Sequence, residues 1–115
     1  MLPVAYSARA AAADSLLRVT PGTRFLLHAK GEALLRLGRF DPAKTALQSF
    51  TWTGADERLE AMREKALGQA ELRLRQYQEA RVSFWLSLNS VSTPAARHDV
   101  DDWIGFCDWM ATHED

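Results

Sequence analysis

The sequence is poor in the residues that build β-sheets and disulfide frameworks. Valine and isoleucine together contribute 6 of the 115 residues, whereas alanine and leucine contribute 33. Strong helix formers therefore dominate, which argues against a sandwich, a barrel or a doubly wound sheet. The single cysteine, Cys107, excludes an internal disulfide and a cysteine-rich zinc site. A chain of this length builds one domain, and its composition predicts an all-α protein.

Long apolar runs and a strong net charge are also missing. No apolar stretch approaches the roughly 18 residues that span a bilayer, and the first residues lack the pattern of a signal peptide. We therefore expect a cytoplasmic protein with no membrane partner. The net charge of −1 gives no global reason to expect nucleic acid. Residues 24–94 nevertheless carry a net +3 and residues 95–115 a net −5, so a nucleic-acid-binding helical-repeat protein that uses the basic middle segment is the alternative hypothesis.

Two segments of the chain repeat at a distance of 37 residues. Residues 29–43 read AKGEALLRLGRFDPA, and residues 66–80 read ALGQAELRLRQYQEA. Both contain A-x-G-x-A-x-L-R-L, followed by an aromatic residue and then by an alanine three residues later. A period in this range is typical of stacked two-helix units.

The glycines of the repeat predict close contacts between helices. Gly31 and Gly68 fall in mid-helix, where glycine costs about 1 kcal/mol of helix propensity against alanine. That cost is tolerable where a second helix approaches closely. Four alanines are expected to be small contact positions of the same kind: Ala33, Ala43, Ala70 and Ala80. Leu47 and Phe84 follow the last alanine of each repeat by four residues and share its helical face.

Proline, glycine and short polar stretches divide the chain into six predicted helices. These cover residues 4–18, 23–37, 41–51, 55–74, 78–91 and 94–112. Asp41 and Thr93 each precede a proline, so each is expected to cap the helix that follows. Gly38 is expected to take the left-handed conformation that commonly ends a helix. Because all connections are short, successive helices are expected to be antiparallel neighbours.

The repeated residues resemble the tetratricopeptide repeat (TPR), a helix–turn–helix unit normally of 34 residues. The resemblance covers about residues 24–54 and 61–94. It rests on Gly31, Ala33, Leu34, Gly38, Phe40, Ala43 and Leu47 in the first repeat, and on Gly68, Ala70, Tyr77, Ala80, Phe84 and Ser87 in the second. It implies an all-α, right-handed stack of antiparallel helix hairpins, a TPR-like solenoid with flanking N- and C-terminal helices.

The resemblance divides the single domain, residues 1–115, into four parts. These are an N-terminal helix (1–22), a first repeat (23–54), a second repeat (55–93) and a C-terminal capping helix with an acidic tail (94–115). Residues 4–18 resemble the second helix of a preceding unit. The sequence departs from the family's pattern at Phe50, Glu64 and Glu71. Its repeat of 37 residues is also three residues longer than usual, and we place the extra residues near 52–56. We therefore expect the stack to bend or splay between the repeats.

The resemblance also implies a function. In this family the first helices of the hairpins line a concave groove that holds an extended or helical peptide from a partner protein. The corresponding positions here are Phe25, His28, Glu32, Leu35, Arg36, Met62, Lys65, Gln69, Leu72 and Arg73. Arg36 and Arg73 are equivalent, so we expect them to lie side by side and to bind carboxylates. The predicted protein is an adaptor or small chaperone, and its thin core suggests a homo- or hetero-oligomer.

The last predicted helix carries a stripe of large side chains: Trp103, Phe106, Trp109 and Met110. One interpretation is a C-terminal helix that buries these residues on Phe84, Trp85 and Leu88. A second is an exposed docking face for a partner, and a third is an acidic segment that occupies the Arg36/Arg73 groove until a ligand displaces it. The sequence leaves all three open.

Catalytic and metal-binding patterns are scarce. His98 and Asp102 stand four residues apart and could share a metal, but two ligands make a weak site, and a solvated pair is the simpler interpretation. Cys107 lies in the aromatic helix and is expected to be a buried thiol. The sequence has no Walker loop, dinucleotide fingerprint, G-x-S-x-G or H-E-x-x-H. We expect neither an enzyme nor a bound cofactor or metal.

Overall fold

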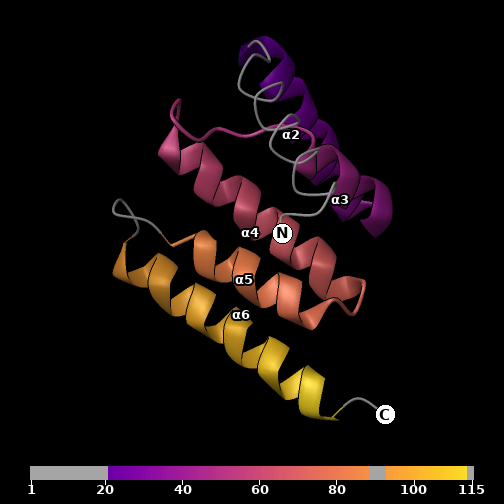
Figure 1. Cartoon of the computed structure of the whole chain (residues 1–115), viewed down its shortest axis with the longest axis vertical. Helices are drawn as coiled ribbons and strands as arrows, with labels where there is room; N and C mark the ends of the chain where they lie inside the picture. Colours follow the sequence, from indigo (N-terminus) through magenta and orange to yellow (C-terminus); the bar gives the residue numbers. More distant parts are fainter. Residues whose placement is uncertain (1–20, 89–92, 114–115) are drawn as a thin grey trace, which may run out of the picture.

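The computed structural model describes residues 21–88 and 93–113, which form five α-helices and no strand. The helices are α2 (Pro21–Arg36), α3 (Phe40–Gln48), α4 (Glu57–Arg73), α5 (Tyr77–Leu86) and α6 (Pro94–His113). They follow one another across the molecule in chain order, from indigo α2 to yellow α6 (Figure 1). The predicted all-α class is confirmed, and the helix predicted over residues 4–18 lies outside the described residues.

The α2–α3 and α4–α5 connections are the same turn built from different residues. Gly38 takes a left-handed conformation with a φ of 78°, and Arg75, 37 residues later, takes one with a φ of 63°. In both turns the next amide donates a hydrogen bond of 2.9 Å to the carbonyl five residues earlier. This bond satisfies a carbonyl at the end of the helix. The prediction for Gly38 is confirmed, and the equivalent arginine adopts a conformation usually left to glycine.

A glycine in the first helix of each hairpin lets the second helix come close. A methyl group added at Gly31 would lie 2.6 Å from Cγ of Leu47, and one added at Gly68 would lie 2.9 Å from ring carbons of Phe84. Leu47 and Phe84 are fully buried, so each glycine faces the core of its hairpin. The predicted close approach at both glycines is confirmed.

Two apolar clusters join the helices. The cluster between α4, α5 and α6 consists of Leu72, Ala80, Phe84, Val100 and Cys107, and the cluster between α3 and α4 consists of Leu47, Ala66 and Leu67, against which Leu35 of α2 packs. Cys107 is buried as expected, and its burial raises the pKa of the thiol. None of the helices in the described part of the chain is both long enough and apolar enough to cross a membrane.

Some local expectations are confirmed and others are wrong. Thr93 caps α6, because its hydroxyl accepts a hydrogen bond of 3.1 Å from the amide of Ala96. Asp41 does not cap α3, since that helix already begins at Phe40 and has no side-chain cap. Three of the four predicted contact alanines are fully buried, namely Ala43, Ala70 and Ala80. Ala33 is exposed.

We predict opposite effects for two glycine-to-alanine substitutions. Gly68→Ala should lower the free energy of unfolding by about 1–2 kcal/mol, because the new methyl collides with the buried Phe84 ring. Gly105→Ala in α6 should raise it by about 0.5–1 kcal/mol, because nothing lies within 4 Å of the added methyl and alanine favours the helix. Urea unfolding of both variants measures the difference, and equal effects would contradict the packing described.

Candidate functional site

Three adjoining hollows lie on the surface formed by α2, α4 and α6. The first, of about 400 Å³ between α2 and α4, is lined by Glu32, Leu35, Arg36, Met62, Lys65, Ala66 and Gln69. The second, of about 430 Å³, shares Leu35, Arg36 and Gln69 with the first and adds Gly38, Phe40, Arg73 and Trp103. Because the two share lining residues, they adjoin each other.

The third hollow extends this surface to α6. It has a volume of about 680 Å³ and shares Arg73 and Trp103 with the second hollow. Its other lining residues are Leu72, Arg75, Tyr77, Asp99, Asp102, Phe106 and Met110. The three hollows together are called the groove below. On α4, groove residues 62, 65, 69 and 73 recur every three or four positions, which places them on one face of the helix.

The groove carries charges of both signs. Arg36 and Arg73 line the same hollow, where Arg36 lies 3.9 Å from Glu32 and the Arg73 guanidinium lies 5.8 Å from the centre of the Phe40 ring. The two arginines thus line one hollow. Lys65 forms an ion pair with Asp99, which ties α4 to α6.

Helix α6 both closes the core and forms a wall of the groove. Trp103 stacks on Phe84, with ring centres 5.3 Å apart, while Phe106 lines the third hollow and is 47% exposed. Trp109 is 53% exposed and stacks on His113. Trp85 does not help to bury this helix, because it is 65% exposed. The interpretation as a core cap is thus correct for Trp103 and wrong for Trp85.

Two residues expected in the groove lie elsewhere. His28 is buried and accepts a hydrogen bond of 3.0 Å from the indole of Trp52, so its other ring nitrogen donates to Glu32, also at 3.0 Å. Phe25 packs against the same indole, with ring centres 4.8 Å apart. The segment between α3 and α4 that holds the extra residues places Trp52 against α2. His28 and Phe25 therefore contact this segment, and neither of them lines the three hollows.

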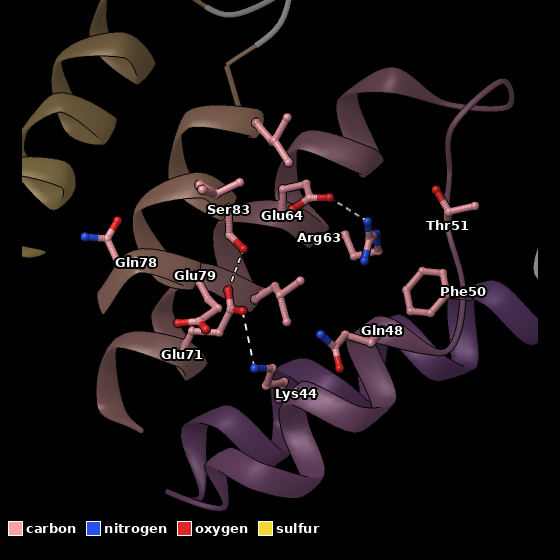
Figure 2. Close-up of a pocket in the computed structure, with 13 residues that line it drawn as sticks. Lys44, Gln48, Phe50, Thr51, Arg63, Glu64, Glu71, Gln78, Glu79 and Ser83 are labelled. Carbon is pink, nitrogen blue, oxygen red and sulfur yellow. Dashed lines mark hydrogen bonds and ion pairs between the residues drawn. The ribbon is translucent and has the colours of Figure 1, made fainter. Parts of the chain in front are cut away.

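A cleft larger than any one of these hollows, which the sequence did not predict, lies between α3 and α5 on the opposite side of α4 (Figure 2). It has a volume of about 890 Å³. Its lining residues are Lys44, Gln48, Phe50, Thr51, Arg63, Glu64, Leu67, Glu71, Gln78, Glu79, Val82, Ser83 and Leu86. The sequence did contain a signal for this cleft, because Glu64 and Glu71 depart from the pattern of the tetratricopeptide repeat. These two residues stand seven positions apart and so share one face of α4. Both point into this cleft (Figure 2).

Four charged side chains of the cleft form ion pairs there, Lys44 with Glu71 and Arg63 with Glu64. Glu71 accepts a hydrogen bond from the hydroxyl of Ser83 and lies 3.4 Å from the ammonium of Lys44. Arg63 donates to Glu64 at 2.7 Å and to the backbone carbonyl of Leu47 at 2.8 Å. Its second carboxylate partner is Glu60. These bonds tie α4 to the neighbouring helices α3 and α5.

The described residues show little that would support metal chemistry. Nδ1 of His98 lies 3.4 Å from a carboxylate oxygen of Asp102, and both side chains are more than 70% exposed. The pair is a solvated contact along α6, as expected. Within residues 21–88 and 93–113, no group of three or more histidine, cysteine or acidic side chains could hold a metal ion together.

Comparison of the chain with protein-family models, curated proteins and solved structures finds no match in any of the three. The geometry of the groove and the repeat itself are therefore the grounds for a functional proposal.

We predict that Glu64 makes stability depend on pH. Burial raises the pKa of its carboxyl from 4.5 to about 7. The folded chain then holds a proton that the unfolded chain releases, so the free energy of unfolding falls as the pH rises from about 4.5 through 7. Between about pH 5.5 and 8.5 this loss should reach about 2 kcal/mol in the wild type and should be absent in Glu64→Gln. Identical pH profiles in urea unfolding would contradict the burial of a protonated Glu64.

Proposed function

We propose that this chain is a non-enzymatic protein-interaction module, an adaptor or a small chaperone, which binds a peptide or helix of a partner protein in the groove. The succession of three adjoining hollows across α2, α4 and α6 carries the proposal. A row of adjoining hollows accommodates a chain that passes over several helices, whereas a small substrate needs one enclosed pocket.

The proposal includes a TPR-like architecture, a right-handed stack in which α2–α3 and α4–α5 are successive units. Its support is the internal repetition at 37 residues. The glycine contacts, at Gly31 and Gly68, recur at this distance, and so do the left-handed residues in the turns, at Gly38 and Arg75. In such a stack the first helix of each unit lines the concave side, and the groove lies on α2 and α4.

The lining of the groove indicates what the partner segment contains. Leu72, Tyr77, Trp103, Phe106 and Met110 give the third hollow an apolar lining that suits a large apolar side chain. The adjoining hollow offers two arginines, which suit a carboxylate one or two residues away. Acidic side chains on α2 and α6 lie among these basic residues, and this mixture of charge favours a peptide over a nucleic acid.

We predict that paired charge reversal in the groove abolishes recognition of acidic peptides. Selection from a library of short random peptides should enrich sequences with an acidic residue near a large apolar one. Arg36→Glu with Arg73→Glu should weaken the best of these by about 10- to 100-fold, because two charge-assisted carboxylate–arginine bonds are replaced by repulsion between like charges. Fluorescence anisotropy of the labelled peptide measures the effect.

The matched control is Arg58→Glu with Arg97→Glu, which makes the same charge change at two exposed arginines outside the groove. The control pair should alter the affinity by less than about threefold, since neither arginine lines a hollow and salt screens exposed charges. Equal weakening by both pairs would mean that net charge drives binding and that the groove does not.

We also predict that Phe106 and Trp109 differ in their effect on binding although both are half-exposed. Phe106→Ala should weaken the selected peptide by about 5- to 30-fold, because its ring lines the third hollow. Trp109→Ala should leave the affinity unchanged, because that ring stacks on His113 and lies outside the hollow. The reverse result, measured in the same titration, would move the interface to the outer side of α6.

A further inference from the structure

The equivalent helices α2 and α4 differ in how one face of each is covered. On α4 this face consists of Arg63, Ala66, Leu67 and Ala70, which are all buried. The residues of α2 that stand 37 positions earlier are Leu26, Ala29, Lys30 and Ala33, which are all exposed. The two helices share the same repeat, so the difference lies in their neighbours.

The helix that covers this face of α4 is the one that precedes it in the chain. Arg63 donates a hydrogen bond of 2.8 Å to the carbonyl of Leu47, near the end of α3. Leu67 packs with the side chain of the same leucine. The corresponding face of α2 would therefore be covered by a helix that precedes α2.

The exposed face of α2 has the composition of a helix contact. Leu26, Ala29, Ala33 and Leu37 recur at intervals of three and four residues, which forms one stripe along the helix axis. The two leucines at its ends are each 73% exposed. The two alanines between them would allow a second helix to approach closely, as small residues do elsewhere in this chain.

We propose that residues 4–18 form a helix that packs on this stripe, in the place that α3 takes on α4. The sequence predicts a helix there, and its own apolar stripe consists of Tyr6, Ala10, Ala13 and Leu17. A helix of this length measures about 22 Å, which exceeds the roughly 17 Å from Leu26 to Leu37. The short link to Pro21, at which α2 begins, gives this segment a high effective concentration at the stripe. That tether favours it over a second copy of the chain.

Hydrogen–deuterium exchange of the full chain, read by mass spectrometry, tests the proposal. Peptides from residues 4–18 should exchange roughly tenfold or more slowly than an unstructured segment, and light scattering at the same concentration should show a monomer. Ala33→Glu should remove this protection and leave that of α4, α5 and α6 intact. The matched control is Ala111→Glu on exposed α6, which should leave residues 4–18 protected.

Three outcomes would overturn the proposal. The first is unprotected exchange of residues 4–18 in the wild type, and the second is protection that survives Ala33→Glu. The third is protection that disappears on dilution as a dimer dissociates, which would assign the stripe to a second copy. If Ala33→Glu also removes the protection of α4, α5 and α6 from exchange, Leu26→Lys serves as a second variant of the stripe. Leu26 is 73% exposed in the described structure, and the same three outcomes would overturn the proposal.

Discussion

The contact between a mid-helix glycine and the side chain beneath it determines how each hairpin closes. Gly31 lies against Leu47, and Gly68 lies against Phe84, with no room for a methyl group in either place. Close packing of this kind fixes the separation of two helices, because a buried side chain has few alternative positions. The same contact recurs after 37 residues, and so does the left-handed turn that follows each first helix. Both hairpins are therefore versions of one unit.

The two sides of α4 border different surfaces, because they carry different kinds of side chain. One side carries the groove residues Met62, Lys65 and Gln69. The other carries Glu64 and Glu71, whose carboxylates take Arg63, Ser83 and Lys44 as partners in the cleft between α3 and α5. Burial of an acid is costly unless such partners are present. The α4–α5 hairpin thus has the same helix pairing as the α2–α3 hairpin. In addition, α4 borders a polar cleft on one side and the groove on the other.

Much of the local structure could be predicted from the sequence, because its causes are local. The glycine contacts, the turn at Gly38 and the cap at Thr93 follow from the properties of single residues. The burial of His28 could not be predicted, since it depends on Trp52 folding back from a distant segment. The exposure of Ala33 depends in the same way on what lies beside α2. For the groove, the resemblance identified residues on α2 and α4, but the wall formed by Phe106 required the position of α6.

The central claim is that both hairpins close on their glycines. The most direct test is the nuclear Overhauser spectrum of the full chain in solution. The account predicts cross-peaks between the α-protons of Gly31 and the methyl groups of Leu47, and between the α-protons of Gly68 and the ring protons of Phe84. Absence of either set, with both spin systems assigned, would contradict the repeated unit on which the groove depends.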